Sequence, residues 1–339
     1  MWAILARWKK YRAPGGVRWQ SRQRGYLMDY RRLGNSGLEV SVVGIGCNNF
    51  GRRCDPDQTK AVVDKAIEVG INLFDTADVY GGDGLSEQYL GKALQGRRQE
   101  AVIATKFAGS MGEGPMTKGT SRKHIMDAVD ASLERLGTDY IDLYQVHFPD
   151  PETPMEETMR ALDDLVRSGK VRYLGNSNYA GWQIAHAQWI AEHHHLTPFI
   201  SAQNQWSLLE RGVEREVVPA AKAFGLGVLP YFPLASGLLT GKYKRGEAAP
   251  EGTRLSAGPM AERALTDANF DIVEKLEEYA QTHGHTLLEL AFGWLASHPA
   301  TGSVIAGATR PDQVESNAAA AAWVLTAEER ADVDALTKR

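Results

Sequence analysis

Polar side chains stand at the ends of several apolar runs that we predict to be strands. Asp75 follows the second run, Lys106 ends the third, His147 follows the fourth, Asn176–Asn178 close the fifth and Gln203 ends the sixth. Carboxylate, ammonium, imidazole and amide groups transfer protons and bind polar ligands. Any one of them has an ordinary structural explanation, such as a helix cap or a core histidine. Five in succession predict an active site.

These side chains can share one site only if the runs form a sheet whose carboxyl ends meet. From Leu38 onward, short apolar runs alternate with amphipathic stretches, which is typical of repeated βα units. The predicted strands are Val42–Gly46, Leu73–Thr76, Val102–Lys106, Ile141–Val146, Tyr173–Asn176, Ile200–Gln203, Val228–Tyr231 and Ser303–Ala306. The predicted helices include Asp57–Val69, Ser86–Leu94, Ser121–Leu136, Pro154–Ser168 and Arg211–Phe224. Evenly spaced units without a dominant glycine fingerprint favour an α/β fold of the (β/α)₈ TIM-barrel type over an open sheet.

Two further segments complete the predicted domain, residues 28–339. Tyr30–Val42 carries Asn35-Ser36-Gly37 between two extended segments, which predicts an N-terminal β-hairpin that plugs one barrel end. After the seventh strand, Lys244–Ala264 is rich in Gly, Pro and Ala and too long for an ordinary connection. Loops of this length are usually functional. We expect a single barrel domain with this long loop.

The first 27 residues differ in composition from the rest. They contain Lys9, Lys10 and five arginines but no acidic residue. The apolar stretch Met1–Ala6 is too short for a secretory signal, and no small-residue cleavage site follows it. We predict for residues 1–27 a disordered basic extension, or a start codon assigned too early with Met28 as the natural beginning.

Composition and charge exclude several classes of function. A net charge of -4 among 24% charged residues gives no basic surface for nucleic acid. The sequence contains no run of about 18 apolar residues, the length that a membrane-spanning helix needs. Cys47 and Cys54 are too few for a disulfide framework and lie in no zinc motif, so we expect a reducing cytoplasm and no metal. Consecutive residues of a helix point to different faces, so His193–His195 cannot converge on one ion.

Three separated motifs resemble the aldo-keto reductase family, and the resemblance extends over nearly all of Met28 to the C-terminus. Phe74–Tyr80, with Ser86-Glu87 and Leu90-Gly91, resembles the family's Asp and Tyr segment. Ala104-Thr105-Lys106 and Asp142–His147 resemble its Lys and His segments. The resemblance implies a barrel enzyme that reduces an aldehyde or ketone with NADP(H). It also implies a catalytic tetrad of Asp75, Tyr80, Lys106 and His147.

Carbonyl reduction needs these residue types. Negative charge builds on the carbonyl oxygen as hydride arrives, so a proton donor must stand there. The resemblance gives that role to Tyr80, and we expect the Lys106 ammonium to lower the pKa of its phenol from the usual value near 10. Asp75 would hold Lys106 in place. His147 would donate a hydrogen bond to the same carbonyl oxygen and orient the substrate.

The resemblance also implies the cofactor and substrate contacts. Ser177, Asn178 and Gln203 would bind the nicotinamide carboxamide, flanked by aromatic rings, and Arg310 offers a fork for a 2′-phosphate, which favours NADP(H) over NAD(H). The loop 231–243 would fold over the pyrophosphate and the segment 307–317 would bind adenosine. The expected cofactor contacts are Gly46, Cys47, Asp75, Ser177, Asn178, Gln203, Trp206, Tyr231, Phe232, Leu234, Ser236, Gly237, Lys242, Arg254, Gly307, Thr309, Arg310, Gln313 and Asn317. The expected substrate pocket comprises Asn48, Phe50, Tyr80 and His147.

Several positions depart from the family pattern. Cys47 stands where Thr is common, and Asn48 where a larger apolar residue is usual. Phe232 replaces a frequent Ser in the pyrophosphate loop. Gln313 and Ser316 replace a frequent Arg and Glu in the adenosine segment, which bears on coenzyme preference.

A regulatory binding module is the alternative class of function. Pro149-Asp150-Pro151 and Pro154–Glu157 also resemble potassium-channel β subunits, which keep the barrel and the cofactor but serve a channel. Those proteins typically carry Asn at the position of His147, so this residue favours a reductase over a binding module or redox sensor. A barrel enzyme of different chemistry would bind no nicotinamide cofactor. The small-molecule carbonyl substrate and the oligomeric state, monomer or homo-oligomer, stay open.

Overall fold

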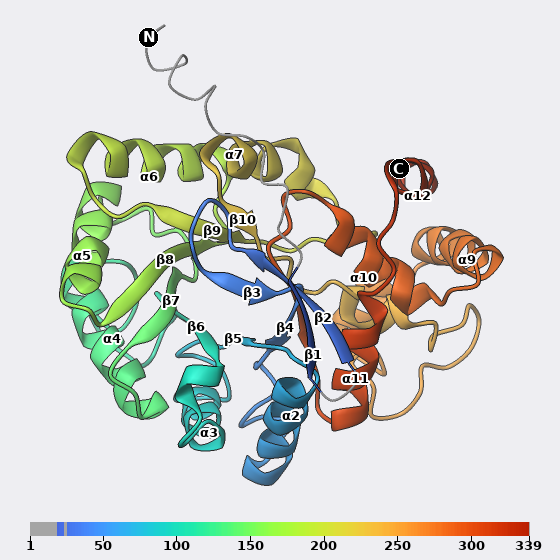
Figure 1. Ribbon diagram of the computed structural model, residues 1–339, viewed down its shortest axis with the longest axis horizontal. Coiled ribbons are helices and arrows are strands. Elements are labelled where there is room, and N and C mark those ends of the chain that lie inside the picture. Colours follow the sequence, from blue (N-terminus) through green and yellow to red (C-terminus); the bar gives the residue numbers. More distant parts are fainter. Residues whose placement is uncertain (1–18, 24–25, 339) are drawn as a thin grey trace, which may run out of the picture.

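The computed structural model describes residues 19–23 and 26–338. A sheet of eight parallel strands lies inside a ring of helices (Figure 1). The strands are β4 (Val43–Gly46), β5 (Leu73–Asp75), β6 (Val102–Phe107), β7 (Ile141–Val146), β8 (Val171–Ser177), β9 (Phe199–Gln203), β10 (Gly227–Val228) and β11 (Val304–Gly307). They are ordered β10-β9-β8-β7-β6-β5-β4-β11.

Backbone hydrogen bonds close the sheet between its two edge strands. The Gly302 amide donates to the Val228 carbonyl over 2.7 Å, and the Ile305 amide donates to the Pro230 carbonyl over 2.9 Å. Thr301 also forms a parallel bridge with Val228. The predicted (β/α)₈ barrel is therefore confirmed.

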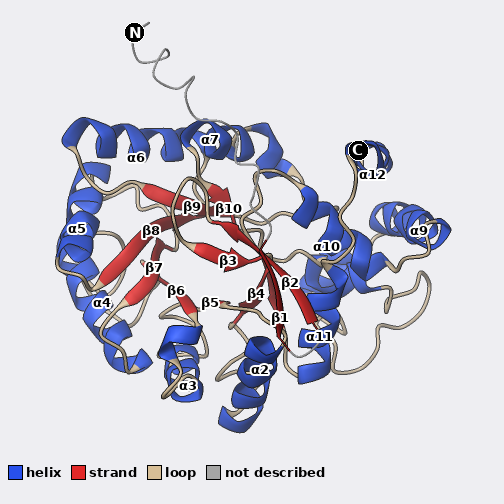
Figure 2. Cartoon of the chain, in the orientation of Figure 1, coloured by secondary structure: helices blue, strands red, loops and turns tan. Residues whose placement is uncertain are grey.

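Helices surround the barrel (Figure 2). They are α2 (Pro56–Glu68), α3 (Leu85–Ala93), α4 (Arg122–Leu136), α5 (Met155–Arg167), α6 (Gly181–His194), α7 (Val217–Phe224), α8 (Pro259–Ala264), α9 (Asp267–Thr282), α10 (Leu287–Ser297), α11 (Pro311–Ala320) and α12 (Ala327–Leu336). Short 3₁₀ segments are η2 (Arg98–Glu100), η3 (Gly212–Arg215) and η4 (Ala235–Thr240). The predicted helices start and end within one residue of the observed ones, except that η3 precedes α7.

An N-terminal hairpin plugs the end of the barrel where the strands begin. Its strands β2 (Tyr26–Arg32) and β3 (Glu39–Ser41) pair antiparallel, and they cross the barrel in Figure 1. Leu33 and Val40 are fully buried and pack in one cluster with Leu73 and Leu143 from the barrel strands. The predicted plug is confirmed, and the burial of its apolar side chains explains why it stays there.

A further strand precedes the hairpin. β1 (Trp19–Gln23) pairs antiparallel with β2. This strand falls in the segment for which the sequence predicts disorder. Residues 1–18 and 24–25, the rest of that segment up to Tyr26, lie outside the described residues.

The seventh barrel strand is shorter than predicted and leads into the long loop. β10 ends at Val228 rather than Tyr231, because Pro230 has no amide hydrogen to donate to a neighbouring strand. Tyr231 keeps only an isolated bridge to Gln205. Beyond η4 the chain has no helix or strand until α8, so the predicted long loop is present, with its last six residues helical.

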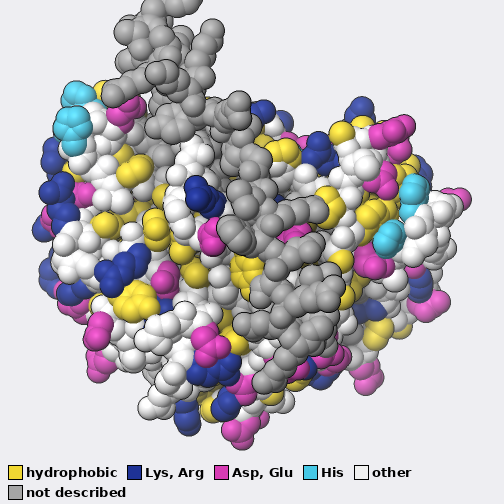
Figure 3. Space-filling model, in the orientation of Figure 1, with side chains coloured by type: hydrophobic (Ala, Val, Ile, Leu, Met, Phe, Trp, Pro, Cys, Tyr) yellow, Lys and Arg dark blue, Asp and Glu magenta, His cyan; other side chains and the backbone are white. Residues whose placement is uncertain are grey.

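The surface mixes charges of both signs. Figure 3 shows Lys and Arg side chains interspersed with Asp and Glu over the visible face, with no large region of one sign. Within residues 19–23 and 26–338, no helix is both long and apolar enough to cross a bilayer. The same residues contain no cluster of His, Cys, Asp and Glu suited to a metal ion.

Candidate active site

Three titratable side chains meet at the carboxyl ends of β5 and β6. Lys106 Nζ donates to Asp75 Oδ2 over 2.7 Å, to the Thr76 carbonyl over 2.9 Å and to the Tyr80 hydroxyl over 3.5 Å. Asp75 ends β5, Tyr80 lies in the turn that follows, and Lys106 belongs to β6. Parallel barrel strands bring their carboxyl ends to one face, so residues far apart in sequence converge.

Lys106 is held in its charged form although it is fully buried. Burial disfavours an ammonium, but the Asp75 carboxylate and the Tyr80 oxygen beside it favour the charge. The outcome is a pKa of Lys106 above its usual value. The site therefore keeps one positive charge next to the phenol of Tyr80.

The Asp75 carboxylate is fixed on both oxygens. Lys106 occupies Oδ2, while Oδ1 accepts hydrogen bonds from Gln203 Nε2 over 2.7 Å and from Gln145 Nε2 over 3.1 Å. Both glutamines are buried. Gln145 lies in β7 and was not among the predicted site residues. These amides leave the carboxylate little freedom to turn away from Lys106.

The phenol of Tyr80 is kept neutral. Burial raises its pKa, and Asp75 adds to that effect, while Lys106 acts in the opposite direction. The net shift of the pKa is upward from 10. The expected lowering of the Tyr80 pKa is therefore wrong for this structure: Lys106 acts as predicted, but burial outweighs it. A neutral phenol is a proton donor.

His147 is a neutral imidazole beside Tyr80. It follows β7 and is buried, and its ring meets the Tyr80 ring edge to face, with centroids 5.7 Å apart. Burial and the positive charge of Lys106 lower the pKa of His147 from 6.5 to about 3. A neutral ring carries one N–H, so His147 can donate one hydrogen bond and accept another.

Two further acidic residues, Asp78 and Glu87, lie buried near these groups. Glu87 accepts a hydrogen bond from Arg135 Nε over 2.7 Å. Asp78 Oδ1 accepts from the Val79 amide over 2.7 Å, whereas Oδ2 has no partner among the described residues. Burial and the negative charge of Glu87 raise the pKa of Asp78 from 3.8 to about 7. Asp78 therefore makes the stability of the fold depend on pH.

Replacing Asp78 with Asn should stabilise the protein at alkaline pH. Since the folded state holds a proton that the unfolded chain releases above pH 4, wild-type stability falls as pH rises from about 4 to about 7. Asp78→Asn removes this loss, so its unfolding free energy at pH 8 should exceed that of wild type by on the order of 2–4 kcal/mol. Urea unfolding at pH 4 and pH 8 measures the difference, which should vanish at pH 4. Asp83→Asn, at an exposed position in the same loop, is the control, and an equal gain at both pH values would contradict the argument.

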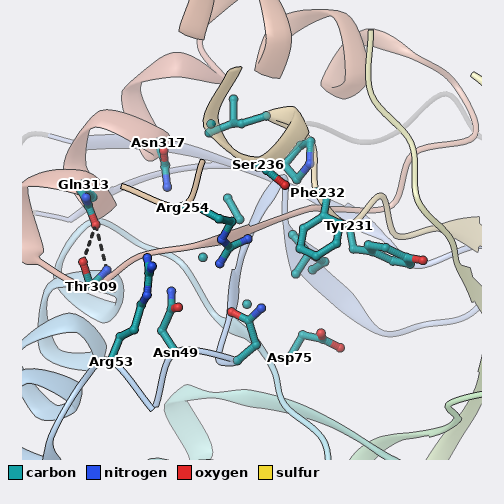
Figure 4. Close-up of a pocket in the computed structure, with 18 of the residues that line it drawn as sticks. Asn49, Arg53, Asp75, Tyr231, Phe232, Ser236, Arg254, Thr309, Gln313 and Asn317 are labelled. Carbon is teal, nitrogen blue, oxygen red and sulfur yellow. Dashed lines mark hydrogen bonds between the residues drawn. The ribbon is translucent and has the colours of Figure 1, made fainter. Parts of the chain in front are cut away.

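Asp75, Tyr80 and His147 face a cavity of about 760 Å³ along the carboxyl ends of the strands. In Figure 4 it extends from Tyr231 to Thr309 and Gln313. This volume lies in the range of small-molecule and cofactor sites. Most predicted residues line it: Gly46, Asn48, Asp75, Tyr80, His147, Ser177, Asn178, Gln203, Tyr231, Phe232, Leu234, Ser236, Gly237, Lys242, Arg254, Gly307, Thr309, Arg310, Gln313 and Asn317.

One end of the cavity carries hydroxyl and amide groups. Ser177 ends β8, and Asn178 follows it with a left-handed backbone (φ 61°). Asn178 Nδ2 donates to the His147 carbonyl over 2.9 Å, and its Oδ1 accepts from the Tyr231 hydroxyl over 2.8 Å. Gln203 reaches the same region from β9. This set offers the donors and acceptors that a carboxamide needs.

The loop after β10 has a backbone suited to phosphate. Phe232, Ala235, Ser236 and Gly237 all have positive φ, between 46° and 98°. Non-glycine residues adopt this conformation at a cost of about 1–3 kcal/mol each, and such turns direct amide hydrogens into an anion-binding hollow. At Gly237 a Cβ atom would come within 2.9 Å of Lys242 Nζ, so the close approach of this cation depends on the glycine.

The other end of the cavity lies at the start of α11. Gln313 Oε1 accepts from the Thr309 amide over 2.8 Å and from its hydroxyl over 3.2 Å, as the dashed lines in Figure 4 mark. Arg310 is bound to both oxygens of Asp312, each over 3.0 Å. The N-terminus of a helix favours anions, so a ligand with phosphate groups fits this end.

Four predicted site residues do not reach the cavity. Cys47 and Phe50 are fully buried, and burial together with Asp75 raises the pKa of the Cys47 thiol far above its usual value, which makes it inert. Trp206 is also buried, packs edge to face against Trp294 and donates Nε1 to Glu214 over 3.0 Å. Its expected position beside a cofactor ring is therefore not found. Lys106 lies behind Tyr80, and its Nζ donates to the Tyr80 hydroxyl over 3.5 Å.

Other lining residues were missed from the sequence. They are Asn49, Arg53, Phe148, Pro233, Thr240, Glu251, Gly252, Thr253, Leu288, Ile305, Ala306 and Ser316. Arg53 lies between β4 and α2, and every such loop of a barrel reaches the active-site face, so its position was a usable signal. Leu288 comes from α10, and no motif marks it.

Comparisons with known proteins show the family to which this chain belongs. The model of the Aldo/keto reductase family matches residues 42–338. A probable voltage-gated potassium channel subunit beta of Arabidopsis thaliana is 39% identical over 298 residues, which cover 86% of this chain and 90% of the relative. The versiconal hemiacetal acetate reductase of Aspergillus parasiticus is 36% identical over 328 residues (89% and 95%). The L-glyceraldehyde 3-phosphate reductase of Escherichia coli K12 is 34% identical over 302 residues (86% of each). This chain belongs to the aldo/keto reductase family of oxidoreductases.

Proposed function

We propose that this protein is an NADP(H)-dependent reductase that converts a small aldehyde or ketone into an alcohol, with Tyr80 as the general acid. One observation carries the proposal: Lys106 Nζ lies between the Asp75 carboxylate and the Tyr80 hydroxyl, and the phenol faces the cavity. A neutral proton donor backed by a buried cation suits a reaction that develops negative charge on oxygen.

The residues divide the chemistry between them. The nicotinamide, when bound, supplies hydride to the carbonyl carbon. Tyr80 gives its proton to the carbonyl oxygen, and the Lys106 ammonium stabilises the phenolate that remains. Asp75 keeps Lys106 in place. Neutral His147 donates its N–H to the same oxygen and orients the substrate. Solvent then returns a proton to Tyr80.

The groups along the whole length of the cavity suit the successive parts of NADP(H). Ser177, Asn178 and Gln203 would hold the carboxamide, and the positive-φ loop from Phe232 to Gly237 would hold the pyrophosphate. The segment from Gly307 to Asn317 would hold adenosine. The cations that line the cavity support NADP(H) rather than NAD(H), because the 2′-phosphate adds negative charge.

We also propose a cytoplasmic location. Cys47 and Cys54 are both free and buried, which suits a reducing compartment. The proposed partner is a small carbonyl compound, and neither nucleic acid nor a membrane takes part.

The similarity to potassium-channel β subunits supports a second candidate, a regulatory binding module that holds the same cofactor. The two candidates differ in turnover, since a module of this kind needs cofactor binding but no rapid chemistry. The neutral donor pair of Tyr80 and His147 at the cavity supports the reductase.

The test is a fluorescence titration with NADPH and with NADH, followed by NADPH oxidation after a simple aromatic aldehyde is added. The reductase requires tight NADPH binding and steady oxidation. Binding without oxidation across a panel of aldehydes and ketones would support the regulatory module. Failure to bind either cofactor would refute both candidates.

A further inference from the structure

Arg53 places a positive charge in the cavity. It lies in the loop between β4 and α2 and lines the cavity. Across residues 19–23 and 26–338, no carboxylate forms an ion pair with Arg53 or with Arg254, although Glu251 lines the same cavity. Unpaired guanidinium groups that face a cavity are suited to bind an anion from solution.

The position of Arg53 in the cavity identifies which anion it meets. In Figure 4, Arg53 points toward the end formed by Thr309 and Gln313, away from Tyr231 at the carboxamide end. Arg254 stands between Arg53 and Phe232 of the pyrophosphate loop. If a dinucleotide binds along the cavity as proposed, Arg53 faces its adenosine half and Arg254 lies closer to the pyrophosphate.

Two other residues that line this end of the cavity, the cation Arg310 and the neutral Gln313, are less suited to that role. Arg310 is engaged by both carboxylate oxygens of Asp312, each over 3.0 Å, with 62% of its side chain exposed. The family pattern often has Arg at the position of Gln313, but here the Gln313 side chain accepts from Thr309 instead. Arg53 therefore supplies, from the other wall, the positive charge that position 313 lacks.

The electrostatics of the cavity agree with an anion site. Burial and the neighbouring charges of Arg53 and Arg52 lower the pKa of Arg254. Cations that oppose one another in this way are relieved when an anion binds between them. Arg52 is exposed and does not line the cavity, so it adds to the field without offering a contact.

We propose that Arg53 binds the 2′-phosphate of the cofactor and is the main determinant of preference for NADPH over NADH. The inference rests on the proposed function, since it names the residue that reads one part of the proposed cofactor. It replaces Arg310 in that role.

The test compares dissociation constants of NADPH and NADH, without substrate, for wild type and the variants R53Q, R53K, R52Q and R310Q. R53Q should raise the Kd of NADPH by about tenfold or more and leave that of NADH within about twofold, because only NADPH carries the phosphate monoester. R53K should recover part of the loss. The effect of R53Q should shrink at high ionic strength, since Arg53 is exposed. R52Q is the matched control: Arg52 adds to the field but offers no contact, so its loss should change the Kd of NADPH by less than about twofold. R310Q should change the ratio of the NADPH and NADH dissociation constants less than R53Q does.

Several results would overturn the proposal. An equal rise in Kd for both cofactors would place Arg53 at the shared pyrophosphate. If R53Q left the Kd of NADPH unchanged but raised the KM for glyceraldehyde 3-phosphate more than the KM for glyceraldehyde, Arg53 would bind the substrate instead. If R310Q raised the Kd of NADPH more than R53Q does, Arg310 would be the residue that binds the 2′-phosphate. An unaltered NADH affinity shows that R53Q is folded. Wild type that binds neither cofactor would refute the proposed function rather than the role of Arg53.

Discussion

Tyr80→Phe should lower kcat for aldehyde reduction by about a hundredfold to ten-thousandfold, the usual range for loss of a general acid. The hydroxyl is the group that faces both the cavity and Lys106 Nζ, 3.5 Å away, so its removal leaves no proton donor in that place. The Kd of NADPH should stay close to that of wild type, because the ring of Phe keeps the packing against His147. Single-turnover kinetics and a cofactor titration measure the two quantities.

Tyr89→Phe is the matched control. Tyr89 lies on α3, partly buried and outside the residues that line the cavity, and loses the same hydroxyl group. Its kcat should equal that of wild type. If Tyr80→Phe also turned over at the wild-type rate, Tyr80 would have no part in proton transfer, and His147 would be the next donor to test.

Lys106→Met should affect both stability and turnover. Lys106 and Asp75 are an almost wholly buried pair, and removing one partner leaves the other charge uncompensated, which typically costs about 3–5 kcal/mol. We therefore expect the free energy of unfolding in urea to fall by that amount at neutral pH. The kcat should fall at least as far as in Tyr80→Phe, since the phenolate loses the cation that stabilises it.

A double variant separates these two effects. In Asp75→Asn/Lys106→Met the buried charge is gone, and the Asn oxygen can still accept from Gln145 and Gln203. The double variant should therefore regain most of the stability lost by Lys106→Met but none of the turnover. If it were no more stable than Lys106→Met, the loss would come from packing at position 106 and not from an unpaired carboxylate.

The sequence alone determined the architecture and which polar side chains to expect at one face of the barrel. Alternation of apolar runs with amphipathic stretches records which residues must be buried, and this pattern holds without knowledge of distant contacts. It placed the barrel strands, the helices α2, α3, α4, α5 and α7, and the hairpin plug. Motif order then placed Asp75, Tyr80, Lys106 and His147, because barrel topology brings every strand end to one face. Strand ends were less certain, as Pro230 shows for β10.

Only the tertiary structure decided how these residues are surrounded. The Tyr80 pKa depends on the balance between burial and the charge of Lys106, and no spacing in the sequence records that balance. Gln145 is fixed as a support of Asp75 by the pairing of β7 beside β6, and Trp206 is withdrawn into the core by its packing on Trp294. Arg53 belongs to the cavity because its loop faces α11, which lies at the opposite end of the sequence. Such contacts arise from the closure of the barrel, so they are properties of the folded chain and not of any local segment.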